Sequence, residues 1–164
     1  YQRLKTGFSV ITREDIRTEW SYIKSISLLP TLLLKEEAKQ NGANDTILIR
    51  NGYAIEGTSS NVFIVKNGTL ITPPLDHCIV NGITREIVLK LAKKHFIPIK
   101  KKRITKKALF SADEIWITSS SRDIMPITII DHQEINDGKL GSLWTKMSKI
   151  FEDYKTSYAS TKEN

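Results

Sequence analysis

The apolar positions of this chain follow two periods, that of a strand and that of a helix. Residues 7–17 alternate apolar and polar side chains, which predicts a β-strand, because successive strand side chains point to opposite faces. From Leu28 to Gly42, leucines recur at helical spacing between charged residues, which predicts an amphipathic helix with Pro30 in its first turn and Gly42 at its end. Lys24 lies among apolar residues where the predicted strand passes into this helix.

Short apolar runs separated by turn dipeptides follow this helix. Asn51-Gly52 and Asn67-Gly68 are typical of tight hairpins, so we expect short antiparallel strands over residues 46–49, 53–55, 61–65 and 69–71. Further on, the pattern predicts a helix over 83–96, strands over 97–104, 114–118 and 124–130, a terminal helix over 140–154 and a frayed tail over 156–164. No repeat or internal linker interrupts the pattern.

Length and composition are those of one globular domain. The chain has 164 residues, 40% of them hydrophobic, which is enough for a real core. Its longest apolar runs are too short for a membrane span, so no membrane association is expected. One cysteine, Cys78, excludes an internal disulfide, and we interpret it as a packed thiol. A reducing, cytoplasmic location is therefore expected.

The formal charge of +7 raises the question of nucleic-acid binding. The densest basic run, residues 100–107, is flanked by Ile97, Pro98, Ile99 and Ile104, which predicts an edge strand and turn with solvated lysines. No aromatic pattern of an RNA-binding surface accompanies it. We therefore expect no nucleic-acid partner.

Candidate chemistry concentrates between Glu56 and Arg85. A lone acid, Glu56, precedes a run of small hydroxyl residues and an apolar strand, and a Gly-Ile-Thr-Arg step then enters a helix. Lys24 lies 32 residues before Glu56. A buried amine, a carboxylate and a phosphate cradle would suit pyridoxal 5′-phosphate (PLP), which presents an aldehyde, a ring nitrogen and a phosphate.

The same stretch resembles the signature of the class IV (fold-type IV) aminotransferases. The matching positions are Glu56, Thr58, Asn61-Val62-Phe63, Leu70-Ile71-Thr72 and Val80-Asn81-Gly82-Ile83-Thr84-Arg85. The resemblance implies an α+β fold with a mixed sheet or pseudo-barrel and packed helices. It also implies that residues 1–155 are the larger, C-terminal PLP-binding domain, and that a small N-terminal domain is missing. The chain alone is then expected to be inactive.

The resemblance assigns roles to single residues. It implies that Lys24 is the catalytic Schiff-base lysine, that Glu56 contacts the pyridine nitrogen, and that Gly82, Ile83 and Thr84 bind the phosphate at the start of a helix. It places a second phosphate contact at Ser119 and Ser120. Arg17 is a further candidate near the cofactor, although an ion-paired structural role is equally compatible with its position. His77, His95 and His132 share no ligand spacing, so no metal site is expected.

Within the family, the segment around Lys24 is most similar to D-amino-acid transaminase. The predicted function is therefore transfer of an amino group between a D-alanine-like amino acid and a 2-oxo acid. Trp20-Ser21-Tyr22 departs from the Arg-Cys-Asp that often occurs there. Aminodeoxychorismate lyase, giving 4-aminobenzoate and pyruvate, and branched-chain aminotransferase remain open, as does a non-catalytic scaffold. Family resemblance also implies a homodimer for the full-length protein.

Overall fold

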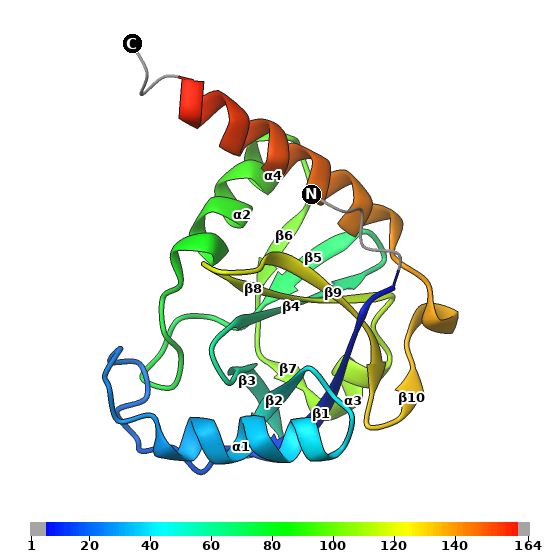
Figure 1. Ribbon diagram of the computed structural model, residues 1–164. Coiled ribbons are helices and arrows are strands. Elements are labelled where there is room, and N and C mark those ends of the chain that lie inside the picture. The colour runs from blue at the N-terminus through cyan, green and yellow to red at the C-terminus, as the bar shows by residue number, and fades with distance from the viewer. Residues whose placement is uncertain (1–5, 161–164) are drawn as a thin grey trace.

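The computed structural model describes residues 6–160, which form a closed β-barrel with helices packed around it (Figure 1). The strands are β1 (Phe8–Glu14), β2 (Asp45–Arg50), β3 (Tyr53–Gly57), β4 (Asn61–Lys66), β5 (Thr69–Thr72), β6 (Ile99–Lys101), β7 (Ile104–Thr105), β8 (Glu114–Ser119), β9 (Asp123–Ile130) and β10 (Gln133–Glu134). The helices are α1 (Leu29–Gln40), α2 (Ile83–Lys94), α3 (Lys106–Phe110) and α4 (Ser142–Ser160), with a short 3-10 turn, η1 (Asn136–Gly138).

Six strands close the barrel in the order β3, β4, β8, β9, β1, β2. Both hairpins predicted from Asn-Gly turns are present, β2–β3 and β4–β5, and Asn51 and Asn67 adopt the positive φ that such turns require. β1 is parallel to both of its neighbours, β2 and β9. The remaining pairs in the barrel are antiparallel, so the sheet is mixed, as expected.

Isoleucine and valine fill the barrel interior. This cluster includes Val10, Ile47, Val62, Ile115 and Ile127, each at most 3% exposed. Every barrel strand except the short β3 contributes at least one of these β-branched side chains, which fit the pleated inner surface. The interior of the barrel is therefore packed core.

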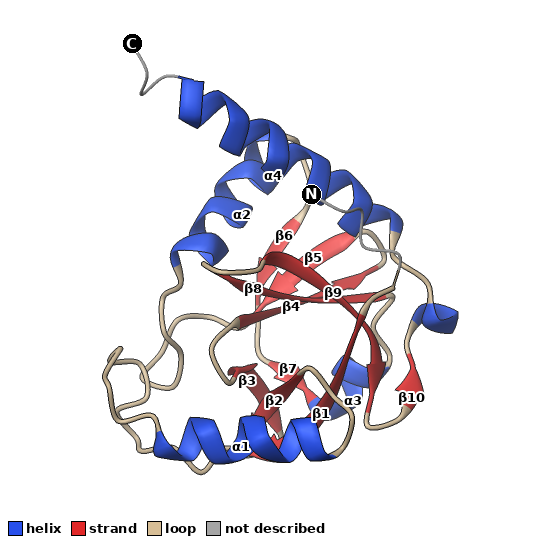
Figure 2. Cartoon of the chain, in the orientation of Figure 1, coloured by secondary structure: helices blue, strands red, loops and turns tan. Residues whose placement is uncertain are grey.

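A second apolar cluster joins α2 and α4 to the outside of the barrel. Phe63 and Trp116, neighbours in the β4–β8 register, pack with Val88 of α2 and Met147 and Phe151 of α4. Figure 2 shows these two helices together over the same sheet region, whereas α1 crosses the opposite end of the barrel. Adjacent residues of β8 thus serve different cores: Trp116 faces the helices and Ile117 faces the barrel interior.

Several elements differ from the sequence-based expectations. The strand expected over 97–104 is split, because β6 pairs with β5 at one end of the sheet while β7 pairs with β3 at the other. α3 was not predicted; Thr105 caps it by accepting a hydrogen bond from the Ala108 amide. The terminal helix continues to Ser160, supported by Tyr154–Tyr158 ring stacking, so residues 156–160 are helical, and residues 161–164 lie outside the described part.

Replacing Met147 with alanine should lower the free energy of unfolding by about 2–5 kcal/mol, because it leaves a cavity in the cluster that attaches α4. Chemical denaturation measures this change. The control is Lys146→Ala, at an exposed position of the same helix, which should shift stability by less than about 0.5 kcal/mol. Equal effects of the two substitutions would contradict the packing of α4.

Candidate active site

Glu56 lies near the end of β3, where its carboxylate is almost fully buried. Arg17 donates from Nη1 to Oε1 at 2.6 Å. On the other side, the Asn61 side-chain amide and the Val80 backbone amide both donate to Oε2 at 3.2 Å. Glu56 and Asn61 also form the register pair that joins β3 to β4. The carboxylate is therefore fixed by three segments of the chain, and its backbone belongs to the closure of the barrel.

Arg17 is itself held by a second carboxylate. Its guanidinium binds Asp15 through Nε at 2.9 Å and Nη2 at 3.0 Å, in the two-pronged geometry that fits a carboxylate well. Arg50 binds the same Asp15 at 2.8 Å, and the Asp15 side chain has no exposed surface. The result is a partly buried chain of alternating charges, Arg50, Asp15, Arg17 and Glu56. Arg17 is thus an ion-paired arginine in direct contact with the expected cofactor residue.

Burial raises the pKa of Glu56 to about 7, and the charge and hydrogen bond of Arg17 and the Val80 amide offset part of this effect. The burial of Glu56, 3% exposed as a residue, is the larger influence. A carboxyl group with a pKa near neutrality is suited to sharing a proton with a basic nitrogen of similar affinity.

Gly82 precedes α2 and allows it to approach the Glu56 site closely. A Cβ on Gly82 would lie 2.1 Å from Oδ1 of Asn61, so a larger residue would displace the amide that contacts Glu56. Gly82 gives the helix no side-chain cap, so the first amides of α2, from Ile83 and Thr84, are available to an anion. Ile83 is exposed and Thr84 is buried. The structure therefore brings Glu56 and the start of α2 together.

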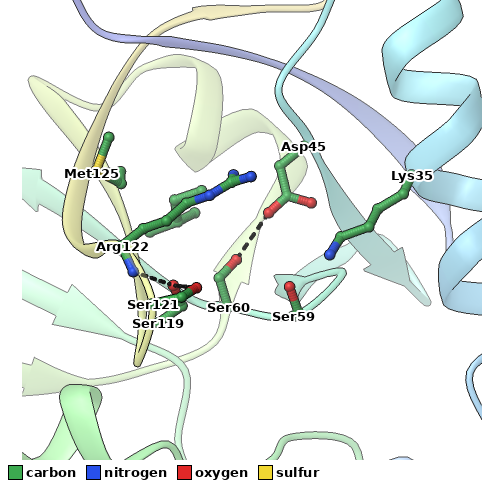
Figure 3. Close-up of a pocket in the computed structure, with 9 residues that line it drawn as sticks. Lys35, Asp45, Ser59, Ser60, Ser119, Ser121, Arg122 and Met125 are labelled. Atoms are coloured by element: carbon green, nitrogen blue, oxygen red, sulfur yellow. Dashed lines mark hydrogen bonds between the residues drawn. The ribbon is translucent and has the colours of Figure 1, made fainter.

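The hydroxyl side chains of Thr118, Ser119 and Ser120, at the end of β8 and in the turn after it, do not all point to the same side of the sheet. Ser119 follows the alternation of Ile117 and lines a small cavity at the mouth of the barrel (Figure 3), and Ser120 lies exposed in the turn. Thr118 lies on the side of Trp116, which α2 covers, and it is the register partner of Asn61. The hydroxyl of Thr118 is buried and has no hydrogen-bond partner among residues 6–160.

Lys24 does not lie at an apolar strand end, as the sequence pattern suggested. β1 ends at Glu14, and Lys24 is exposed in the loop between β1 and α1, where no hydrogen bond or ion pair links it to the described residues. Neighbouring apolar side chains are exposed as well: Trp20 is 66% and Ile26 98% exposed. Trp20 contacts the ring of Tyr22, which is itself 40% exposed, so this part of the loop forms no buried apolar setting. The expected burial of Lys24 is therefore wrong for this structure.

The middle of this loop is also tied to the rest of the site. Ser21 donates to the Cys78 carbonyl at 3.2 Å, which joins the loop to the segment that leads into α2. A cavity of about 480 Å³ lies between the two segments, with Arg17, Arg50 and Cys78 in its wall. Cys78 is buried, as interpreted from the sequence, and its sulfur accepts a hydrogen bond from Arg50.

Comparison with known proteins identifies the family. The model of "Amino-transferase class IV" matches residues 1–130. The chain belongs to the class IV aminotransferases. It is similar to D-alanine aminotransferase of Staphylococcus epidermidis, with 40% identity over 159 residues, covering 97% of this chain and 56% of that protein. It thus spans about half the length of the curated relatives it matches.

Two solved structures carry the same fold. A putative branched-chain amino acid aminotransferase from Thermotoga maritima is 32% identical with a TM-score of 0.83, covering 94% of this chain and 57% of the other. A branched-chain amino acid aminotransferase from Escherichia coli is 27% identical with a TM-score of 0.77, covering 88% of this chain and 51% of the other. The barrel with its helices is therefore the fold-type IV C-terminal architecture that the sequence predicted.

The described residues fit PLP at two of its three functional groups. Glu56 offers a buried carboxyl to the ring nitrogen, and the uncapped start of α2 offers amides to the phosphate. The unpartnered Thr118 hydroxyl lies on the side of β8 that α2 covers and can supply a further donor. For the aldehyde, the structure shows an exposed Lys24 and, within residues 6–160, no enclosed amine beside Glu56.

Sequence reasoning missed three residues of this site: Asp15, Asn61 and Thr118. Asn61 carried a signal, because it is part of the signature segment, yet its contact with Glu56 needs the β3–β4 register. Asp15 and Thr118 carried no such signal. An acid two residues before an arginine and a threonine within a strand are both common in proteins and do not indicate a functional site. Among residues 6–160 no cluster of three potential metal ligands occurs, and no helix is long and apolar enough to cross a membrane.

Replacing Arg17 with methionine should lower the free energy of unfolding by about 3–5 kcal/mol, because it removes the cation shared by two buried carboxylates. Urea denaturation at neutral pH measures this loss. As a control, Arg103→Met removes an exposed arginine that stacks on Tyr53 and should cost less than about 1 kcal/mol. A loss for Arg17→Met no larger than that of the control would mean that the charge chain is not formed in solution.

The raised pKa of Glu56 also gives a prediction for pH. Because the folded pKa, about 7, exceeds the ordinary value of 4.5, the contribution of Glu56 to stability is present in full below about 4.5 and is lost as pH rises through 7. Glu56→Gln removes this loss, so its free energy of unfolding relative to wild type should rise between pH 5 and pH 8. Denaturation across that range is the measurement, with exposed Glu19→Gln as control; parallel curves for wild type and Glu56→Gln would refute the shift.

Proposed function

We propose that this protein is a PLP-dependent aminotransferase that moves an amino group between a D-alanine-like amino acid and a 2-oxo acid. Class IV aminotransferases use PLP. The single observation that carries the proposal is the buried Glu56, held between Arg17 and the amides of Asn61 and Val80, close to an uncapped helix start. The similarity to D-alanine aminotransferase of Staphylococcus epidermidis, at 40% identity, supports D-alanine as the substrate.

Each group in this site has a chemical task. When bound, PLP supplies an electron sink for the negative charge that develops at the substrate's alpha carbon. Glu56 holds the ring nitrogen in its protonated form, which needs a carboxylate close to it. The amides of Ile83 and Thr84, with Gly82 behind them, bind the phosphate at the positive end of α2. The hydroxyls of Thr118 and of exposed Ser120 can add donors, whereas the Ser119 hydroxyl faces the cavity on the other side of β8.

Lys24 is the proposed base and the point of covalent attachment. Its Nζ would hold the cofactor covalently through the aldehyde, and as a free amine beside a bound substrate it would take up the proton that leaves the alpha carbon and give it back later in the reaction. An exposed loop does not yet give Lys24 the surroundings for this task. The proposal therefore requires that residues 15–28 become covered in the whole protein, which we propose is a homodimer with two domains in each subunit.

Borohydride reduction of the PLP-loaded full-length protein should fix the pyridoxyl group on Lys24, because the reduced bond cannot be hydrolysed. Peptide mapping by mass spectrometry locates the label. Lys24→Arg should abolish labelling, and Lys39→Arg, which changes an exposed lysine of α1, should leave it intact. A label on any other lysine would remove the assignment of Lys24.

Substrate assays on the same preparation separate the related activities. D-alanine with a 2-oxo acid should give pyruvate and a new amino acid. Conversion of L-leucine instead would favour a branched-chain aminotransferase, which the 32% identity to the Thermotoga maritima structure also keeps in view. Release of pyruvate from aminodeoxychorismate would identify the lyase. If D-alanine, L-leucine and aminodeoxychorismate all leave the cofactor absorbance unchanged, the protein would be a non-catalytic scaffold.

A further inference from the structure

Arg50 contacts both of the segments that hold Glu56, although it does not bind Glu56 itself. It is the last residue of β2, and the tight turn at Asn51-Gly52 pairs it with Tyr53 of β3, so the backbone that carries it belongs to the barrel. Its side chain is 18% exposed and lies in the wall of the cavity of about 480 Å³. The proposed reaction gives this side chain no task.

One side of the Arg50 guanidinium fixes the start of the loop between β1 and α1. Its Nη2 donates to Oδ2 of Asp15 at 2.8 Å and to the backbone carbonyl oxygens of Arg17 and Thr18, each at 3.3 Å. The Asp15 backbone amide also donates to the Ile49 carbonyl at 2.7 Å, so this stretch runs beside the end of β2. Arg50 therefore holds the backbone of Arg17 and the carboxylate that orients the Arg17 guanidinium.

The other side of the guanidinium reaches the segment that contacts the second oxygen of Glu56. Nη1 of Arg50 donates to the Cys78 sulfur at 3.3 Å. Two residues further on, the Val80 amide donates to Oε2 of Glu56 at 3.2 Å. Arg17 donates to the other oxygen, Oε1. Donors to both oxygens of Glu56 are therefore supported by one guanidinium.

The charges around Glu56 indicate what Arg50 adds to this support. The carboxylate faces the cation of Arg17, interacts electrostatically with buried Arg85 of α2, and is repelled by Asp15. Arg17 lies between Asp15 and Glu56 and binds both. Arg50 supplies a second cation to Asp15, which leaves Arg17 available to Glu56. Without Arg50, two buried acids would share one directly bound cation, which is unfavourable.

We propose that Arg50 is a positioning residue of the active site, which sets the place and the charge of the Glu56 carboxylate through the two segments that it holds. A guanidinium suits this task, because its planar fork of donors contacts a carboxylate, two carbonyl oxygens and a sulfur at once. This inference rests on the proposed aminotransferase function for the task of Glu56.

The first test measures the affinity of Glu56 for its proton in the full-length protein without PLP. Arg50→Gln should make Glu56 bind its proton about tenfold more tightly, because Asp15 then competes for Arg17. The measurement is a pH titration followed by 13C NMR of protein labelled at the glutamate side-chain carboxyl carbons. The Glu56 signal is the one that is absent from Glu56→Gln. This readout needs neither cofactor nor turnover.

The second test measures PLP binding and turnover on the same variant. A Glu56 that keeps its proton at neutral pH offers no negative charge to the ring nitrogen, so Arg50→Gln should weaken PLP binding and lower kcat, each by roughly tenfold. KM for the amino acid should change by less than about twofold, because Arg50 has no task in holding the substrate. Ultrafiltration gives the dissociation constant of PLP, and steady-state kinetics give kcat and KM.

Three further variants separate this role from a structural one. Arg50→Lys keeps a cation beside Asp15 but cannot make all the contacts of the fork, so the proton affinity of Glu56 should rise by only about threefold. Arg103→Gln removes an exposed arginine from the same cavity and should change none of these quantities. Met147→Ala loosens the separate core beneath α4 and should lower stability without changing the titration of Glu56.

Each outcome has a defined meaning once thermal unfolding has shown that a variant is folded. Unchanged proton affinity and PLP binding in Arg50→Gln would overturn the proposal, because Arg50 would then be a structural ion pair alone. If Arg50→Gln does not fold, Arg50→Lys decides, and a Glu56 titration equal to that of the wild type overturns the proposal. If the titration shifts as expected but the wild type does not convert D-alanine, the proposed activity fails while the positioning of Glu56 stands.

Discussion

The burial of Glu56 is the constraint on which the rest of the site depends. A carboxylate withdrawn from water is unfavourable unless cations and hydrogen bonds surround it, and here Arg17, Asn61 and the Val80 amide do so. The same residue pairs with Asn61 where β3 meets β4, the contact that closes the barrel. The β3–β4 pairing that closes the barrel therefore also fixes the position of Glu56. Loss of this pairing would open the barrel at the site itself.

Two kinds of surface meet at this point. Inside the barrel, aliphatic side chains give a dry and rigid support, and outside it α2 and α4 are held by Phe63, Trp116 and Met147. Adjacent residues of β8 alternate between the two, so that Thr118 and Ser119 present their hydroxyls on opposite sides of one strand. Polar groups at the strand ends are thereby distributed to the start of α2 and to the cavity at the barrel mouth.

The loop over residues 15–28 contrasts with this rigid frame. Its first residues are fixed, because Asp15 and Arg17 belong to the buried charge chain, whereas Trp20, Ile23 and Ile26 expose large apolar surfaces. Lys24 lies in the exposed part. The first part of the loop is therefore held by ion pairs, and the second part is exposed. The catalytic assignment of Lys24 depends on what covers this second part in the whole protein.

The sequence alone determined the elements and the family. Asn-Gly turns, period-two apolar runs and the helical leucine spacing are local signals, so the hairpins, α1 and α2 could be predicted. The residue types at fixed spacing between Glu56 and Arg85 indicated the class IV aminotransferases. Tertiary structure alone decided that β6 and β7 diverge, that Asp15 binds Arg17, that Thr118 faces α2 and that Lys24 is exposed. These outcomes depend on strand register and on contacts between residues distant in sequence, for which no local pattern exists.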